Sequence, residues 1–219
     1  MYFPEPCFSY DKENCQRFFT KEYVDIVNCL ESDICPAEYK KIYFTRSGIL
    51  DKKDFGEKKI EDLFERNGYK ILHPEKMSFD EQISLLKGCD SFACTEGSVS
   101  HNVIFCKDKT DVVIIRKCNM INGYQMALNS LRDFSVTYID SNKTVPANKR
   151  HPYLGPFFLY MSDLLADYFN LPHEKFPLGK YAVYLCFVMK QRLHSIMVKL
   201  IICFISLTTF FRIVREIKS

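Results

Sequence analysis

The amino-acid sequence predicts an α/β fold: a Rossmann-like, mostly parallel sheet with helices on both faces, followed by a helical C-terminal tail. Short apolar runs alternate with helix-patterned segments between residues 41 and 140. The runs are rich in β-branched and aromatic residues, which favour strands. Parallel strands need crossover connections, and these are right-handed, so helices are expected on both faces of the sheet.

Five segments are expected to form the strands of this sheet. They are "KIYFT" (41–45), "YKIL" (69–72), "DSFAC" (90–94), "TDVVII" (110–115) and "FSVTYID" (134–140). Four successive apolar residues, 112–115, end the run 110–115, which is typical of a strand buried on both faces. The chain contains no GxGxxG pattern, so the dinucleotide-binding fingerprint is absent.

Helices are expected between these strands. Residues 57–68 place Ile60, Leu63 and Phe64 at helical spacing and end at Gly68, a typical C-terminal cap. The segment 78–88 begins with the capping-box pair Ser78 and Glu81. Two further helices are expected, a short one at "SVSHNVIFC" (98–106) and another at "INGYQMALNSLRD" (121–133).

The two ends of the chain are less regular. Residues 17–30, "RFFTKEYVDIVNCL", have the apolar spacing of an amphipathic helix, and residues 156–170 are also expected to be helical. We divide the chain into a linker with one helix (1–38), a Rossmann-like domain (39–150) and a helical C-terminal region (151–219).

The tail contains an apolar run, "LIICFISLTTFF" (200–211), between Lys199 and Arg212. A membrane-spanning helix needs about 20 apolar residues, so a buried or interfacial helix is expected, with a true span as the alternative. Basic residues on either side of the run suit a membrane surface.

Composition excludes several functional classes. The net charge of +3 gives no indication of nucleic-acid binding. The ten cysteines include no CxxC pair and no accompanying histidine cluster, so no metal site is expected. Free cysteines in apolar runs fit a reduced, cytoplasmic compartment. The N-terminus lacks a basic segment followed by an apolar one, so no signal peptide is expected.

The strongest candidate for a functional site is the turn in "CTEGSVSHNVIF" (94–105), where polar residues follow a strand. Ligands of open parallel sheets bind beyond the carboxyl ends of the strands. Gly97 permits close backbone approach, Ser98 and Ser100 offer hydroxyl groups, and the following helix offers free N–H groups to a phosphate. His101 and Asn102 fall on its first turn.

Arg46, at the end of another strand, can supply a guanidinium to the same diphosphate. Each polar residue also has a purely structural alternative. Ser98 is suited to capping the helix, Asn102 to satisfying backbone groups, and His101 to an exposed surface.

The segment 41–105 resembles glycosyltransferase family 61, a group that includes bacterial capsular-polysaccharide transferases. The resemblance rests on an ordered set of motifs within about 65 residues, and extends more loosely from about 40 to 140. In order, the residues that carry the resemblance are Arg46, Gly56, Glu57, Gly68, Tyr69, Pro74, Glu75, Glu81, Gln82, Gly97, Ser98, Asn102 and Phe105.

The resemblance implies one half of a GT-B architecture and an inverting sugar transfer that uses no bound metal and no cofactor. A nucleotide-sugar is the implied donor and a saccharide the implied acceptor, in surface-polysaccharide synthesis at the inner face of the plasma membrane. The implied donor-site residues are Arg46, Gly97, Ser98 and Asn102, with Ser100 and His101 as neighbours. Glu57 and Gln82 are the candidates for structural roles, in capping and packing.

Two departures from the family pattern stand out. Many members have a histidine where this chain has Glu96, and a carboxylate beside a diphosphate would be repulsive unless it faced a sugar hydroxyl or a cation. The resemblance also implies an acceptor-binding domain ahead of the donor domain, but only about 40 residues precede it here. We therefore expect a fragment or a divergent short form, and the sequence identifies no general base.

Two other functions fit the same residues. The chain could be a non-catalytic nucleotide-sugar-binding module that acts with a separate acceptor-domain protein. It could also be a small membrane-associated protein whose tail is the main functional part. Turnover by the purified chain distinguishes the enzyme from the module, and removal of the tail tests the third hypothesis.

Overall fold

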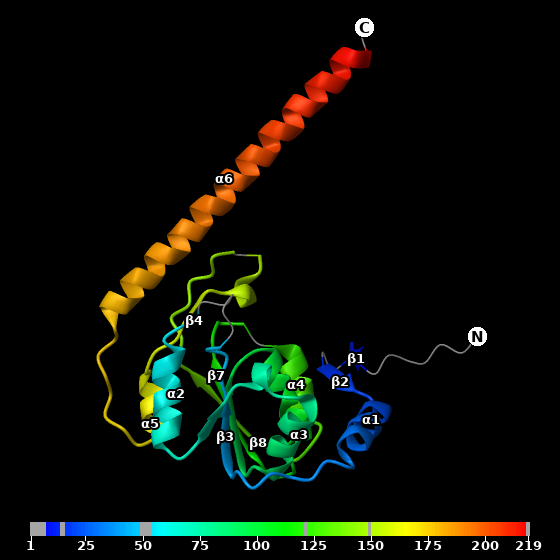
Figure 1. The fold of residues 1–219 in the computed structure, drawn as a ribbon, viewed down its shortest axis with the longest axis vertical. Helices are drawn as coiled ribbons and strands as arrows, with labels where there is room; N and C mark the ends of the chain where they lie inside the picture. The colour runs from blue at the N-terminus through cyan, green and yellow to red at the C-terminus, as the bar shows by residue number, and fades with distance from the viewer. Residues whose placement is uncertain (1–7, 14–15, 49–53, 121, 149, 218–219) are drawn as a thin grey trace, which may run out of the picture.

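The computed structural model describes residues 8–13, 16–48, 54–120, 122–148 and 150–217 (Figure 1). It confirms the α/β prediction: a five-stranded parallel sheet lies at the centre, with helices on both sides and one long helix projecting from the body. The Rossmann-like arrangement and the helical C-terminal region are both present.

The five strands expected from the sequence form this central sheet. They are β3 (Lys41–Phe44), β5 (Lys70–Leu72), β6 (Ser91–Thr95), β7 (Asp111–Arg116) and β8 (Ser135–Asp140). Their order across the sheet is β5-β3-β6-β7-β8, and each neighbouring pair is parallel. Strand β3, the first of the five along the chain, therefore lies inside the sheet.

Helices cover the two faces of the sheet. One face carries α2 (Glu57–Arg66) and α5 (Asp163–Tyr168). The other carries α1 (Lys21–Glu31), α3 (Phe79–Gly88), α4 (Gly123–Asn129) and the 3₁₀ helix η2 (Ser98–Phe105). Two further 3₁₀ turns are η1 (Pro74–Lys76) and η3 (Pro152–Leu154).

Successive side chains of β3 point to opposite faces of the sheet, and both faces are apolar because its residues 42–44 are all apolar or aromatic. Ile42 and Phe44 belong to the core under α3 and η2, whereas Tyr43 belongs to the core under α2 and α5. All three side chains are fully buried. Burying such side chains contributes about 1.5–3 kcal/mol each, so the central strands are the main source of stability for the platform on which the site is built.

The ends of the helices follow the expected capping rules. Ser78 and Glu81 form the predicted capping box, in which Ser78 Oγ accepts from the Glu81 N–H at 3.2 Å. Gly68 follows α2 with a φ of +84°, a left-handed conformation that favours glycine. Asn122 and Ser162 cap α4 and α5 through their side-chain oxygens.

The expected helix at 17–30 begins later than predicted. Strand β2 (Gln16–Phe19) pairs antiparallel with β1 (Phe8–Asp11), and α1 starts only at Lys21. Phe18 and Phe19 have high β-propensity. This preference outweighs the helical spacing that they share with the following residues. Val27 is the residue of α1 that is fully packed into the core.

Residues 156–170 also differ from the single helix that was expected. Phe157–Phe158 forms β9, which pairs parallel with β4 (Asp54–Phe55), and the helix α5 begins after Ser162. The aromatic run favours an extended chain. Ser162 then caps the start of α5, because its side chain accepts a hydrogen bond from the Leu165 N–H. The short helix expected at 98–106 is present, but it is of the 3₁₀ type.

The C-terminal tail forms one helix, α6 (Leu178–Ile217), which is about 60 Å long at the usual helical rise. Its first turns pack on the body, where Tyr184 and Val188 join a small core with Phe158. Within the residues that the structure describes, no helix combines the length and the apolar character needed to cross a membrane.

Candidate functional site at the carboxyl end of the sheet

The topology places the predicted turn at the switch point of the sheet. The connection from β3 leads outward to β5, whereas the chain then returns to the other side of β3 to form β6. Between β3 and β6 the crossovers diverge, and this is where open α/β sheets bind ligands. Arg46 follows β3 and Gly97 follows β6, so two elements that are 50 residues apart in sequence meet there.

A cavity of about 300 Å³ opens beside this switch point. Its walls include three of the six predicted site residues, Arg46, Ser98 and Asn102. Gln82 of α3 also lines it, and Gln82 Oε1 accepts a hydrogen bond from Asn102 Nδ2 at 3.1 Å. The remaining walls are formed by Thr45, Pro74, Glu75 and Val99.

Hydrogen bonds from its backbone and from its side chain hold Arg46 at the floor of the site. Its N–H donates to Glu57 Oε1 at 3.1 Å, and its Nη1 donates to the Glu96 carbonyl oxygen at 3.4 Å. The residue is only 4% exposed. A guanidinium in such a position interacts more strongly with an anion than it would in water, because little solvent screens it.

Gly97 is required by the close approach of two cations. A Cβ atom added at this position would lie 2.5 Å from Arg46 Nη1 and 3.0 Å from Lys117 Nζ. The φ of Gly97 is +153°, which side-chain-bearing residues rarely adopt. The turn after β6 is thus a backbone segment on which a guanidinium and an ammonium converge.

Lys117 is a site residue that the sequence reasoning missed. It follows β7, is 6% exposed, and places Nζ 4.6 Å from the centre of the Phe157 ring, a cation–π distance. The signal that identified Arg46, a basic residue at the end of a buried strand, also applies to Lys117 in "TDVVIIRK".

Glu57 is a buried carboxyl group under the same turn. Burial, followed by the nearby charge of Asp54, raises its pKa from 4.5 to about 7. Its Oε1 accepts from the Arg46 N–H and from Thr95 Oγ1, the latter at 3.2 Å. Its Oε2 has no hydrogen-bond partner among the described residues. Glu57 therefore positions the backbone of Arg46 and holds a proton near neutral pH.

Glu96, the departure from the family pattern, is also withdrawn from solvent. It is 5% exposed, and burial raises the pKa of its carboxyl group while the charge of Lys117 opposes the shift. Its neighbourhood therefore contains a cation, which is one of the two conditions under which a carboxylate is tolerated beside a diphosphate.

Three predicted residues, Gly97, Ser100 and His101, do not line the cavity. Ser100 is fully buried, and its Oγ lies 2.6 Å from both the Gly97 carbonyl oxygen and Gln125 Oε1, so it ties the turn to α4. His101 Nε2 lies 3.1 Å from Asn122 Nδ2. Because Asn122 Oδ1 caps α4, its amide N–H faces the imidazole, and burial together with Lys117 lowers the His101 pKa. In this structure Ser100 ties the turn to α4, and His101 contacts the residue that caps the same helix.

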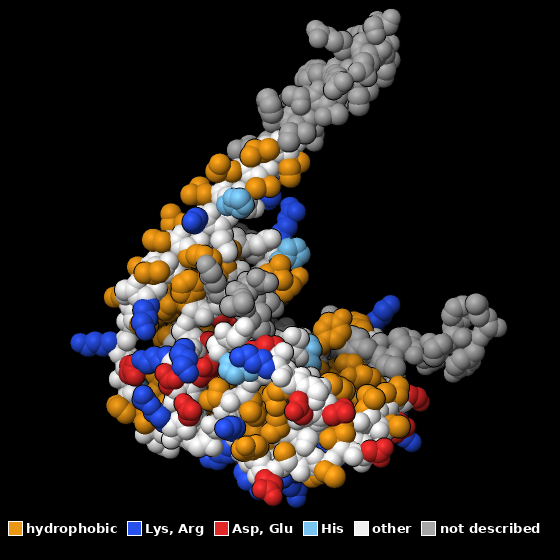
Figure 2. Space-filling view, viewed as in Figure 1, with side chains coloured by type: hydrophobic (Ala, Val, Ile, Leu, Met, Phe, Trp, Pro, Cys, Tyr) orange, Lys and Arg blue, Asp and Glu red, His pale blue; other side chains and the backbone are white. Residues whose placement is uncertain are grey.

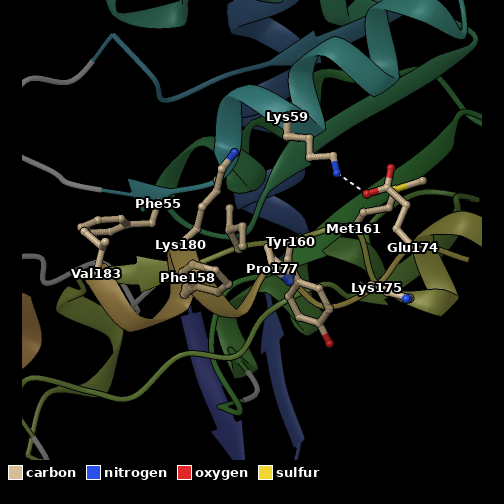
Figure 3. Close-up of a pocket in the computed structure, with 12 residues that line it drawn as sticks. Phe55, Lys59, Phe158, Tyr160, Met161, Glu174, Lys175, Pro177, Lys180 and Val183 are labelled. Carbon is tan, nitrogen blue, oxygen red and sulfur yellow. Dashed lines mark hydrogen bonds and ion pairs between the residues drawn. The ribbon is translucent and has the colours of Figure 1, made fainter. Parts of the chain in front are cut away.

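A second cavity, of about 210 Å³, lies where the C-terminal segment meets the body (Figure 3). Phe55, Phe158 and Val183 form apolar walls, and an ion pair between Lys59 and Glu174 lies at its edge. None of the predicted site residues lines it. Among the residues that the structure describes, no three His, Cys, Asp or Glu side chains are close enough to hold a metal ion.

Comparison with known proteins assigns the chain to a family. The model of glycosyltransferase 61 matches residues 1–113, which is just over half of the 219 residues. The match starts ahead of the resemblance seen from residue 40 and ends within β7, and it includes Arg46, Gly97, Ser98 and Asn102. Among curated proteins, none matches the chain. The chain belongs to glycosyltransferase family 61.

Proposed function

We propose that this protein transfers a sugar from a nucleotide-sugar donor to a saccharide acceptor, and that the donor diphosphate binds at the turn after β6. The observation that carries the proposal is the convergence of Arg46 Nη1 and Lys117 Nζ on Gly97 at the switch point of the sheet. Family membership supplies the reaction class.

The chemistry of this arrangement suits a leaving nucleoside diphosphate. Negative charge grows on the diphosphate as the bond to the sugar breaks, and fixed cations in a site with little water stabilise that charge. Arg46 presents a planar fork of donors to phosphate oxygens, and Lys117 adds a compact positive charge. The two residues are the groups that would neutralise the diphosphate in a metal-independent, inverting transfer of the GT-B type, as the resemblance implies.

The cavity next to the cations provides the remaining donor contacts. Ser98 is exposed at its rim and offers a hydroxyl, and the Asn102 amide is oriented by Gln82. A volume of about 300 Å³ is at the lower end of the range for small-molecule sites. We place the diphosphate and the adjoining sugar in this cavity, with Gly97 allowing the backbone to approach the phosphate oxygens.

We propose further that the acceptor is a saccharide of a surface polysaccharide of the capsular type, extended at the cytoplasmic face of a membrane. The support for this finer assignment is the resemblance of the segment 41–105 to capsular-polysaccharide transferases. Residues 39–150 would then form the donor-binding domain. Leu159, which follows β9, and Leu165 of α5 extend its core, because they belong to the same apolar cluster as Tyr43 of β3 and the buried face of α2.

A turnover assay tests the proposal. The purified chain is incubated with a panel of nucleotide-sugars and saccharide acceptors, and both nucleotide release and glycosylated product are measured. Lys117→Met removes one charge and one charged hydrogen bond, which are worth roughly 1.5–3 kcal/mol, so transfer should fall by about ten- to a hundredfold. Arg66→Ala removes an exposed cation at the far end of α2 and should leave transfer unchanged.

Two results would contradict the proposal. Equal transfer by the Lys117→Met and Arg66→Ala proteins would show that the diphosphate does not bind at this turn. Tight binding of a nucleotide-sugar with no transfer to any acceptor would favour the non-catalytic binding module instead.

A further inference from the structure

Among the residues whose side chains the structure describes, those that attach α6 to the body lie between its start and Arg192. Tyr184 Oη accepts from the Val145 N–H at 2.8 Å and lies 3.2 Å from the Pro156 carbonyl oxygen. Val188 is buried one turn later, and Arg192 Nη2 donates to the Pro146 carbonyl oxygen at 2.6 Å. Beyond Arg192 the helix points away from the sheet, as Figure 1 shows.

The projecting part of α6, together with the turn just before it, exposes large apolar side chains, visible as a row along the helix in Figure 2. They are Met189 (61% exposed), Leu193 (60%), Ile196 (54%), Met197 (60%), Val198 (39%), Ile201 (55%) and Ile202 (57%). A soluble monomer rarely presents so many neighbouring apolar side chains to water, so this surface is expected to have a partner.

The spacing of these residues defines a broad apolar face. Met189, Leu193, Ile196 and Met197 follow one another at intervals of four, three and one, which places them on one side of the helix. Such a face can lie in the boundary layer of a bilayer, where it buries its side chains to a depth of about 5–10 Å.

The charge of the same segment selects the kind of partner. Between residues 175 and 215 the sequence has seven Lys or Arg residues and no Asp or Glu. Lys190 and Lys199 are exposed on the part of α6 that the structure describes. A second copy of α6 would bring the same positive charges and one acidic residue, Glu216, to pair with them, whereas an anionic bilayer is complementary to the whole basic segment.

We propose that the projecting face of α6 binds the surface of a bilayer that contains anionic lipids, and that this helix holds the transferase body beside the membrane. Apolar side chains enter the boundary layer, and the basic residues contact the headgroups. The attachment through Tyr184 and Arg192 fixes the body relative to the helix, so binding would keep the sheet close to the bilayer.

Vesicle co-sedimentation of the full chain tests the apolar part of the proposal. The triple variant Leu193→Gln, Ile196→Gln, Met197→Gln keeps good helix formers but removes much of the apolar face. Its affinity for vesicles of phosphatidylcholine with one-third phosphatidylserine should fall by about a hundredfold or more. The matched control, Ile26→Gln, Leu154→Gln, Leu164→Gln, changes three exposed apolar side chains outside α6 and should bind like the unsubstituted protein.

The electrostatic part is tested with the same vesicles. Each basic residue near an anionic surface is worth about fivefold in affinity, so Lys190→Gln and Lys199→Gln should together weaken binding by about 25-fold. Replacing phosphatidylserine with phosphatidylcholine in the vesicles should also weaken binding of the unsubstituted protein. Light scattering after gel filtration measures whether the protein is a monomer without lipid.

Three outcomes would overturn the proposal. The first is that the triple α6 variant sediments with vesicles as well as its control. The second is that binding is equally tight on neutral and anionic vesicles. The third is that the unsubstituted protein is a dimer without lipid, that the α6 variant is a monomer, and that neither binds vesicles, which would make this face a contact between copies.

Discussion

At the scale of single residues, the carboxyl group of Glu57 connects the stability of the protein to pH. Its pKa is about 7 in the folded protein against an ordinary value of 4.5. Between these values the folded state holds a proton that the unfolded state releases, so stability falls as pH rises through this window. By about pH 8 the loss amounts to roughly 3 kcal/mol.

Replacing Glu57 with Gln should therefore remove this dependence. Glutamine keeps an acceptor for the Arg46 N–H but has no titrating group. We expect the difference in unfolding free energy between variant and parent to shift in favour of the variant as pH rises from 5 to 8, as measured by urea unfolding. A constant difference over this range would show that Glu57 titrates normally.

Gly97 should be intolerant of any side chain. Gly97→Ala places Cβ against the Arg46 and Lys117 nitrogens, and overpacking of this kind costs about 1–3 kcal/mol. The variant should lose both stability and nucleotide affinity. Gly68→Ala is the matched control: it also has a positive φ, but open space surrounds the added atom, so only stability should fall.

Equal nucleotide affinity of the two alanine variants would argue against the convergence of cations at Gly97. Thermal unfolding and calorimetric titration measure the two effects separately, so a loss of folding is not mistaken for a loss of binding.

At the scale of elements, the capping box of α3 supports one wall of the cavity. Helix α3 carries Gln82, which orients Asn102. Ser78→Ala removes the cap and should cost about 1 kcal/mol, or about 2–4 °C in the midpoint of thermal unfolding. Ser195→Ala, at an exposed interior position of α6, should change the midpoint by less. A midpoint that did not move in Ser78→Ala would mean that the cap contributes nothing.

Most elements could be predicted because their local signals agree with the fold. The five strands have β-branched or aromatic runs, and Ser78, Glu81 and Gly68 mark helix ends in the expected way. The predicted elements are wrong where an aromatic run fits both the helical and the strand periodicity. Residues 16–19 and 157–158 pair with β1 and β4, and this pairing is a tertiary contact that no local pattern contains.

The candidate site could be predicted only in part, for a related reason. Arg46, Ser98 and Asn102 line one cavity because strand ends meet at the switch point, which the expected topology already indicated. Lys117 reaches the site because β7 lies beside β6, and Ser100 turns inward toward Gln125. Strand order and side-chain direction depend on the packing of the whole domain.

At the scale of the whole molecule, the body and the far part of α6 should differ in stability. The central strands are buried on both faces, whereas α6 beyond Arg192 has no hydrogen bond to the body among the described residues. Without lipid, amide hydrogens of residues 193–202 should exchange orders of magnitude faster than those of β6 and β7. Protection of α6 equal to that of β6 in lipid-free solution would contradict this separation.

The part of the chain that matches the family model corresponds to one region of the sheet. The family match covers the strands β3, β5 and β6 and the turn that follows β6, which together form the switch point. Lys117 lies just beyond the match, directly after β7, and completes the pair of cations. The proposed donor site is thus formed within the sheet domain itself.

Binding of a nucleoside diphosphate beside Gly97 is tested by calorimetric titration of the full chain with UDP, GDP, CDP and UDP-sugars. It is repeated on Arg46→Ala, Ser98→Ala and Lys117→Met, with Arg66→Ala as the control. We expect that at least one nucleotide binds, that its affinity falls by about ten- to a hundredfold in Arg46→Ala and Lys117→Met, and that it falls less in Ser98→Ala. Unchanged nucleotide affinity in Arg46→Ala and Lys117→Met would show that the diphosphate does not bind at the turn after β6.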